Sequence, residues 1–581
     1  MTEADYNEQV DARSQQILQA CFDKGSYRSV LGFHAAMACG GDPNELIEIT
    51  QERHEAGPFN IIPGMFLLGR WEERIPPEAV QNIKRIFTDA LQQRGNTENH
   101  WLMFYAGNLL AAERWADEPM LWNGLPPAAM HAEASRWILG MISRTATVGH
   151  YEYDSTGYQT MHYVPYLALA EYAQDPKIRH QARQMVYLLL ANMAFEYFHG
   201  AYAGGHSRVG PVNTWTQVGP AQGLNYLYFG DEEFDADRHC HGFAIPPIAA
   251  AFRPPPLVAR MALDRDIPHT VRKTMPPRAV YRHVSQPLEP VRKYTWMSRS
   301  FALGSTQTGL TEAPAAPIDL TSWDLIWMGP RHKAKIVCNH PYRSAGRFSA
   351  FLPELPQRVG RAVGTVKPFL QVPDRLCGAS PYERMMQHEG AIIVLYQIPE
   401  DDLTPYVNCF LPKTHTWCEQ EGWILSDFGD FYVGLRIIGQ YRWEDIHESG
   451  SDGNWIDGWL LRIEDLHPAV VLEAVEADQV ASFSDFCASR CGAHFDMSGW
   501  PSEGRIAVDT IAGHRLEMAY DGPHSINGET IDYRAYPLFE GPGVDAPIDT
   551  GRITFRHGGD ELALDFDVDR SQEMLPMRVI G

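Results

Sequence analysis

The sequence has no long apolar run and comparatively little basic charge. No hydrophobic stretch approaches the roughly 20 residues that a membrane-spanning helix needs. The N-terminal segment MTEADYNEQVDARSQQ also lacks the basic and apolar regions of a signal peptide. The formal net charge of −24 disfavours nucleic acid as the main partner, because binding phosphates requires a basic surface. We therefore expect a cytoplasmic protein that binds neither a membrane nor nucleic acid.

Cysteines are scattered and odd in number, with nine in the chain. Only Cys487 and Cys491 lie close in sequence, and their spacing is not C-x-x-C, so a disulfide framework is not expected. The segment DRHCHGF places His239, Cys240 and His241 side by side. Adjacent residues rarely bind one ion together, which favours structural packing over metal binding. The sequence predicts neither a metal nor a cofactor.

The chain of 581 residues is too long for one hydrophobic core, and its periodicity changes along its length. Helical spacing of apolar residues continues to about residue 260, with prolines crowded near the end of this region, and short β-branched and aromatic runs separated by turn signals follow. We predict an α+β multidomain protein, in which a helical domain (1–243) is followed by a proline-rich linker (244–284) and an antiparallel β-sandwich (285–581).

Three polar and aromatic loops recur in the helical part at almost even spacing, starting at Thr97, Gly149 and Gly200. If each interval is one helical hairpin, all three loops emerge at the same end and line one cleft. Their candidate functional residues are Glu98, Asn99 and His100 in the first loop, His150, Glu152, Asp154, Tyr158 and His162 in the second, and His206 and Arg208 in the third, followed by Asn213 and Trp215.

The first loop reads in part as a helix start. Thr97 fits an N-cap and Glu98 is favoured by the helix dipole, but Asn99 and His100 are mediocre helix formers that a cap does not require. In the third loop, Arg208 is suited to holding a carboxylate through two hydrogen bonds, and Trp215 offers a surface on which a sugar ring stacks.

Several of these features together resemble the heparinase II/III-like and alginate lyase superfamily of polysaccharide lyases. The Asn99-His100 pair opens a helix, and Tyr158 follows at a separation comparable to that family's pattern. The segments TWMSRSFALGS (295–305) and CNHPYRSAGR (338–347) resemble strands that face the cleft in that family. The resemblance implies an N-terminal incomplete (α/α) toroid and a C-terminal antiparallel β-sandwich.

The same resemblance implies β-elimination on a uronic-acid-containing glycan, a reaction that needs no metal. Asn99 and His100 would neutralise the uronate carboxylate, and Tyr158 would act as general acid and base. His340 is the first candidate for a further base and His206 the second. Roles in substrate binding would fall to Glu98, Glu152, Arg208, Trp215, Arg343 and Arg347.

Two other classes of function remain open. A glycoside hydrolase would use Glu98 with Glu152 or Asp154 as its two carboxylates. A non-catalytic glycan-binding protein would need the aromatic groups but not the titratable ones. The partner expected in every case is a glycan or oligosaccharide, and homo-oligomerisation is left open. The orientation of Glu98 distinguishes the two enzymes, because an opposed carboxylate pair favours hydrolysis.

Overall fold

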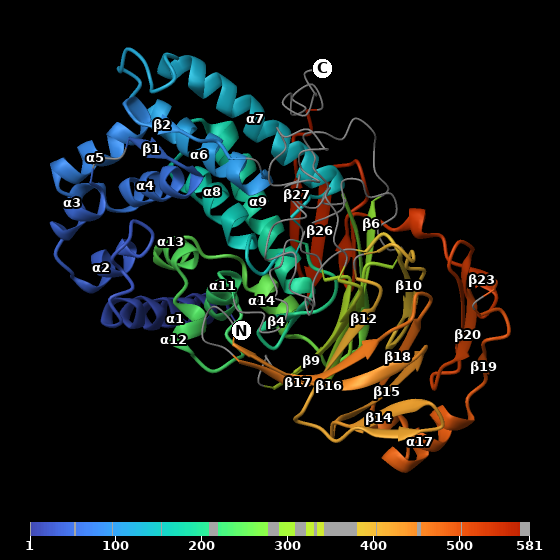
Figure 1. Cartoon of the computed structure of the whole chain (residues 1–581). Coiled ribbons are helices and arrows are strands. Elements are labelled where there is room, and N and C mark those ends of the chain that lie inside the picture. The colour runs from blue at the N-terminus through green and yellow to red at the C-terminus, as the bar shows by residue number, and fades with distance from the viewer. Residues whose placement is uncertain are drawn as a thin grey trace. The chain divides into compact units, whose positions relative to one another are not determined.

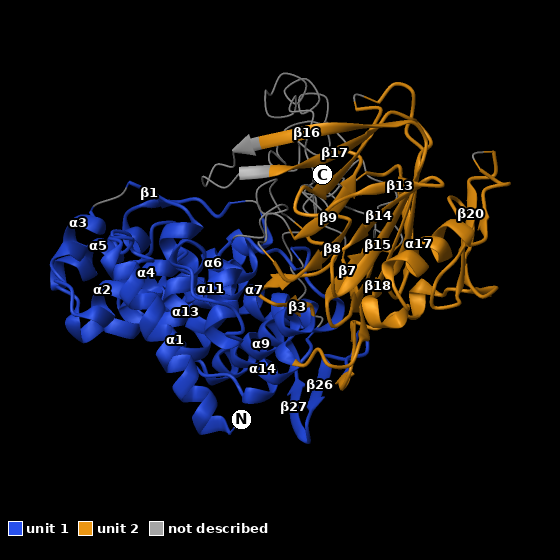
Figure 2. Ribbon diagram, turned by 90° about the horizontal axis from the view of Figure 1, so that it is seen from below, with its two compact units in different colours: residues 1–195, 218–263, 545–578 blue, residues 196–217, 264–544, 579–581 orange. Residues whose placement is uncertain are grey.

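A computed structural model describes residues 2–51, 54–95, 97–152, 154–207, 219–276, 290–307, 321–329, 334–341, 380–402, 404–449, 455–500 and 502–569. The chain divides into two compact units, coloured separately in Figure 2. Unit 1 comprises Met1–Phe195, Val218–Leu263 and Asp545–Arg578, and unit 2 comprises Glu196–Gln217, Asp264–Val544 and Val579–Gly581. The chain is therefore a mixed α and β protein of two units.

Unit 1 is mainly helical (Figure 1). Its helices are α1 (Glu3–Asp23), α2 (Phe33–Cys39), α3 (Glu45–Ile49), α4 (Pro58–Trp71), α5 (Pro77–Thr88), α6 (Glu98–Arg114), α7 (Pro127–Val148), α8 (Gln159–Tyr172), α9 (Pro176–Phe195), α11 (Ala221–Tyr228), α12 (Ala236–His239), α13 (Ile245–Ala249) and α14 (Pro256–Leu263). Its short strands include β1 (Glu55–Ala56), β2 (Leu91–Gln92), β26 (Arg552–His557) and β27 (Asp560–Asp565).

The helices α4 to α9 form three successive hairpins, α4–α5, α6–α7 and α8–α9. Helices α4, α6 and α8 also pack against one another, and nearly every residue of α6 is buried. The segment WLMFYAGNLLAA explains this burial, because a helix that is apolar on all sides is stable only when other elements surround it. The first turns of α6 and α8 lie at the same end of unit 1, where the predicted functional loops begin.

Unit 2 contains two large antiparallel sheets. Their strands are β5 (His269–Met275), β6 (Val291–Met297), β7 (Phe301–Ser305), β8 (Trp323–Trp327), β9 (Lys335–Asn339), β10 (Glu383–His388), β11 (Ala391–Tyr396), β12 (Val407–Pro412), β13 (Cys418–Gln420), β14 (Trp423–Asp427), β15 (Phe431–Ile438), β16 (Tyr441–Ser449), β17 (Trp455–Ile463), β18 (Ala469–Glu476) and β24 (Phe539–Glu540). One sheet has the order β16-β17-β12-β9-β8-β7-β6-β5-β24 and the other the order β10-β11-β18-β15-β14-β13.

A single hydrophobic core contains side chains from both large sheets, including Trp323 and Cys338 from the first and Val394 and Leu435 from the second. A third sheet of β19 (Phe495–Asp496), β20 (Arg505–Asp509), β21 (Arg515–Ala519), β22 (His524–Ile526) and β23 (Glu529–Thr530) follows helix α17 (Phe483–Gly492). Its Val508 and Leu516 share a second core with Ile393 of β11. Successive residues of β11 contribute to the two cores in turn, because neighbouring side chains of a strand point to opposite faces of the sheet.

The unit boundaries differ from the predicted domains. The described part of the predicted linker 244–284 contains α13, α14 and β5, and it is shared between the units. Its prolines are compatible with helices because Pro246 and Pro256 stand in first turns, where a missing N–H costs nothing. Strands β26 and β27, predicted for the sandwich, pack with α14 and α9 in unit 1.

One buried carboxyl in unit 2 predicts a pH-dependent stability. Glu383 at the start of β10 is fully buried, and burial raises its pKa from 4.5 to about 7. A raised folded-state pKa means that the protonated form is stabilised, so this contribution is complete below pH ~4.5 and is lost as the pH rises through ~7. We expect the free energy of unfolding to fall by on the order of 3 kcal/mol over that window.

Urea unfolding between pH ~5 and ~8 measures this effect. Glu383→Gln, which stays neutral, should flatten the pH dependence, whereas Gln at the exposed Glu400 should leave it as in the wild type. An unchanged pH profile in Glu383→Gln would contradict the assignment.

Candidate active site

The first turn of α6 begins as the sequence predicted. The hydroxyl of Thr97 accepts a hydrogen bond from the backbone N–H of His100 at 3.4 Å, which confirms the N-cap. Glu98 and Asn99 are buried, while His100 is half-buried. Successive helix residues point about 100° apart, so Asn99 and His100 face different neighbours. The ring of His100 packs edge-on against Phe59 of α4, with 5.1 Å between the ring centroids.

Glu152 links the first two predicted loops. Its Oε2 accepts hydrogen bonds from the Asn99 backbone N–H at 3.2 Å and from the Asn99 side-chain amide. The same oxygen lies 3.0 Å from Nε2 of His162, in the first turn of α8. All three side chains are almost completely buried. Within the described residues, Oδ1 of Asn99 has no hydrogen-bond partner, although it is fully enclosed.

Glu98 lies beside Glu152 and is paired with Arg144. Nη2 of Arg144 is 2.8 Å from Oε1 of Glu98, and the other carboxylate oxygen accepts the Glu152 backbone N–H at 3.2 Å. Burial raises the pKa of Glu98, and the neighbouring Glu152 adds to this, although Arg144 and His162 act in the opposite direction. Glu98 is thus a buried carboxylate, and each of its two oxygens accepts a hydrogen bond from a protein group.

A second set of buried polar groups adjoins Glu152. The ring of His150 lies 5.0 Å from that of His162, and its burial, together with the neighbouring His162, lowers the pKa of His150 to about 3. Asp154 accepts a hydrogen bond from Nδ2 of Asn192 at 2.9 Å. We call the eight side chains the loop-end cluster: Glu98, Asn99, Arg144, His150, Glu152, Asp154, His162 and Asn192.

Two members of the loop-end cluster were not predicted from the sequence. Arg144 lies near the end of α7, and Asn192 interrupts the apolar run YLLLANMAF of α9. A lone polar residue inside an apolar helical run is a usable signal, because burying it requires a partner. Arg144 carries no such signal, since arginine is a common residue of helices.

Part of the cluster also has the composition of a metal site. Glu98, Glu152 and His162 each offer a ligand atom within 4.8 Å of the others. Their oxygens already accept hydrogen bonds from Arg144, Asn99 and His162, and the guanidinium supplies a positive charge beside them. This donor set is satisfied by protein groups, so the structure favours a hydrogen-bonded network over a metal centre.

Tyr158 precedes α8 and is half-buried. Its backbone N–H donates to Oγ of Ser155 at 3.1 Å, and its carbonyl accepts the backbone N–H of His162. Tyr158 therefore stands one turn before His162, which bonds to Glu152. Tyr158 therefore lies at the same end of unit 1 as the loop-end cluster.

The remaining predicted residues belong to unit 2 or lie outside the described residues. His206 forms a β-bridge with Thr321, and its Nε2 is 3.8 Å from Asp324. His340 is fully buried, with Nδ1 2.8 Å from Oγ of Ser380 and Nε2 2.8 Å from the carbonyl of Thr404. Four residues, Arg208, Trp215, Arg343 and Arg347, fall outside the described residues, as does Asn213.

The prediction that the third loop shares one cleft with the first two stays a prediction. The described part of the third loop, including His206, is grouped with unit 2, whereas the first two loops meet in unit 1. Backbone pairing of His206 with Thr321 holds the loop to a strand segment distant in sequence.

The residues of the DRHCHGF segment have structural contacts. His239 is buried and stacks on Tyr226 with 4.5 Å between ring centroids, and its Nδ1 accepts the backbone N–H of Asp235 at 3.0 Å. The thiol of Cys240 contacts the carbonyl of Ile17 at 3.7 Å. These contacts fit the packing role expected for the segment.

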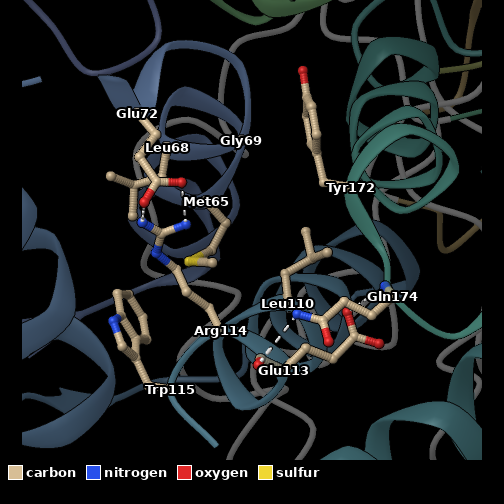
Figure 3. Close-up of a pocket in the computed structure, with 10 residues that line it drawn as sticks. All are labelled: Met65, Leu68, Gly69, Glu72, Leu110, Glu113, Arg114, Trp115, Tyr172 and Gln174. Carbon is tan, nitrogen blue, oxygen red and sulfur yellow. Dashed lines mark hydrogen bonds and ion pairs between the residues drawn. The ribbon is translucent and has the colours of Figure 1, made fainter. Parts of the chain in front are cut away.

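A pocket of about 350 Å³ lies at the opposite end of α4, α6 and α8 from the loop-end cluster. Figure 3 shows Trp115 and Tyr172 on its two sides, with Arg114 bonded to Glu72 on the side of Trp115. No residue predicted from the sequence lines this pocket.

No protein-family model matches the chain, and no curated protein matches it. In the described part of the chain, every helix is too short or too polar to cross a bilayer.

Proposed function

We propose that the chain is a carbohydrate-active lyase that cleaves a uronic-acid-containing oligo- or polysaccharide by β-elimination. The observation that carries the proposal is the setting of Asn99. Its amide is fixed by Glu152 and buried, yet its Oδ1 and one of its two N–H groups are not used by Glu152. The N–H of this fixed amide that Glu152 does not use is the group that would donate to the substrate carboxylate and stabilise the charge that develops on it.

In the proposed reaction, the bond between C5 and its hydrogen breaks, a double bond forms between C4 and C5, and the glycosidic oxygen leaves C4. Asn99 neutralises the carboxylate, which makes the C5 proton more acidic, whereas the ring of His100 faces Phe59 and is not required for this step. Tyr158 transfers a proton to the leaving oxygen and, for one stereochemistry, first removes the C5 proton. Glu152 acts through Asn99 and is therefore a positioning residue.

The fold of each unit supports the same proposal. Three successive helical hairpins with packed inner helices are consistent with an incomplete (α/α) toroid. Two antiparallel sheets that share one core are consistent with a β-sandwich. We assign both architectures as part of the proposal, and fold similarity alone does not define a reaction.

A screen of uronate-containing oligosaccharides and polysaccharides tests the function. The full-length protein should generate new reducing ends together with ultraviolet absorbance from the unsaturated uronate product. The Asn99→Ala variant serves as the matched control. It removes the amide that holds the carboxylate, so it should lose the cleavage that the wild type shows. Cleavage without absorbance would overturn the elimination mechanism, and the absence of cleavage across the panel would overturn the enzyme assignment.

One observation favours glycoside hydrolysis as the second candidate. The carboxylates of Glu98 and Glu152 lie within 4.8 Å of each other, close to the roughly 5–5.5 Å typical of retaining enzymes, and the pKa of Glu98 is raised as a general acid requires. Against it, both carboxylates are buried and hydrogen-bonded to protein donors. Hydrolysis would incorporate oxygen from labelled water into the product and would produce no chromophore.

A further inference from the structure

Two tight turns in unit 2 bring together two histidines and a glutamate. His388 and Glu389 lie where β10 ends, and His514 lies immediately before β21. One ligand atom from each of the three residues lies within 4.8 Å of the other two. The three side chains are half-buried, so they are held by the fold and remain accessible to solvent.

Backbone contacts fix the position of each of the two turns. His388 pairs with Ala391 across the β10–β11 hairpin, so Glu389 and Gly390 form a two-residue turn in which Glu389 has a φ of 47°. A Cβ on Gly390 would lie 2.2 Å from the carbonyl oxygen of Ala474, so glycine permits the close approach to β18, where the Ala474 N–H donates to the Gly390 carbonyl at 2.8 Å. The turn before β21 is closed by the Thr510 N–H donating to the His514 carbonyl at 2.8 Å.

The two turns belong to different sheets that share a core. Met386 and Ile393 of the β10–β11 hairpin pack in the same cluster as Val508 and Leu516 of the β20–β21 hairpin. The positions of His388 and His514 relative to each other are therefore set by buried side chains. Their rings meet edge to face, with centroids 4.5 Å apart.

The three side chains have few protein partners. Among the described residues, the His388 ring and the Glu389 carboxylate have neither a hydrogen bond nor an ion pair with a protein group. His514 uses Nδ1, which lies 3.2 Å from the side-chain amide of Asn527. The positive charge of Arg272, which acts on His388, is offset by an ion pair with Glu540 at 3.2 Å.

We propose that His388, Glu389 and His514 bind one zinc ion. Two imidazoles and one carboxylate are ligands that zinc prefers, and half-burial leaves the fourth tetrahedral position to water. Tetrahedral zinc with bonds of about 2.0–2.2 Å places its ligand atoms roughly 3.3–3.6 Å apart, so side-chain movements of about 1 Å or less complete the site. The bound ion would join the β10–β11 turn to the β20–β21 turn. Asn527 acts through His514 as a positioning residue.

Calorimetric titration of the full-length protein with zinc chloride, after removal of metals with a chelator, tests the site. We expect one equivalent of zinc to bind and to raise the thermal unfolding temperature of the wild type, because the ion binds the folded state. His388→Ala and His514→Ala should each weaken this binding by about 100-fold or more, and Asn527→Ala by about 10-fold.

His467→Ala is the matched control, because His467 is an exposed histidine of the same unit. It should bind zinc as tightly as the wild type. Circular dichroism and unfolding in excess chelator establish that each variant is folded. The proposal is overturned if the wild type does not bind one equivalent of zinc, or if a folded His388→Ala or His514→Ala variant binds it with unchanged affinity. Loss of binding in His467→Ala would also overturn it.

Discussion

Tyr158→Phe is expected to lower kcat for uronate elimination by about 10²–10⁴-fold, with little change in KM. The phenol is the group that we propose to deliver a proton to the leaving oxygen, and phenylalanine keeps the ring while removing that proton. Tyr158 is half-buried at the start of α8, so losing the hydroxyl should change the stability of the fold little. Initial rates of absorbance increase at several substrate concentrations separate kcat from KM.

Tyr187→Phe is the matched control for this prediction. Tyr187 is also half-buried in unit 1, and its ring packs against Phe252. This variant should retain the wild-type kcat and the wild-type unfolding midpoint. Near-normal turnover in Tyr158→Phe would remove Tyr158 from the mechanism, and an equal loss in both variants would indicate a general effect on packing.

The sequence pattern around Thr97 was sufficient to predict where α6 begins. The spacing of the loops was sufficient to predict that the first two loops lie at the same end of the helices. Thr97 is an N-cap because its side chain contacts a backbone group three residues away, and such local contacts are visible in sequence. The meeting of Asn99 with Glu152 followed from loop spacing, since hairpins of similar length return the chain to the same end. The direction of Glu98 was not predictable, because Arg144 reaches it from a separate helix.

Contacts between residues far apart in the sequence could not be predicted from the sequence pattern. The pairing of His206 in the third loop with Thr321, far along the chain, was not visible in the sequence. The linker was inferred from prolines, which stand in the first turns of α13 and α14, where they are tolerated. The orientation of Glu98 was expected to distinguish elimination from hydrolysis. Glu98 lies beside Glu152 but is bonded to Arg144, so product analysis is needed to distinguish the two mechanisms.

The largest effect on stability is expected at Glu196, which lies in a charged cluster inside unit 2. Its carboxylate contacts Nζ of Lys273 at 2.7 Å and Nζ of Lys293 at 2.9 Å, and it accepts the Thr295 hydroxyl at 2.8 Å. The exposed fractions of these four residues are at most 1%. Lys273 and Lys293 are neighbours on paired strands β5 and β6, so their like charges need this carboxylate between them.

Glu196→Ala should therefore lower the free energy of unfolding by about 3–5 kcal/mol, because it removes the anion from beside two buried ammonium groups. Glu196→Gln keeps the shape and one acceptor but not the charge, and should be destabilised by a smaller amount. In Lys273→Met, one buried positive charge is removed and the Glu196–Lys293 pair remains, so this variant should be more stable than Glu196→Ala. Urea unfolding curves for the three variants give the order directly. If Glu196→Ala is as stable as the wild type, the carboxylate does not hold the two lysines in the interior of unit 2.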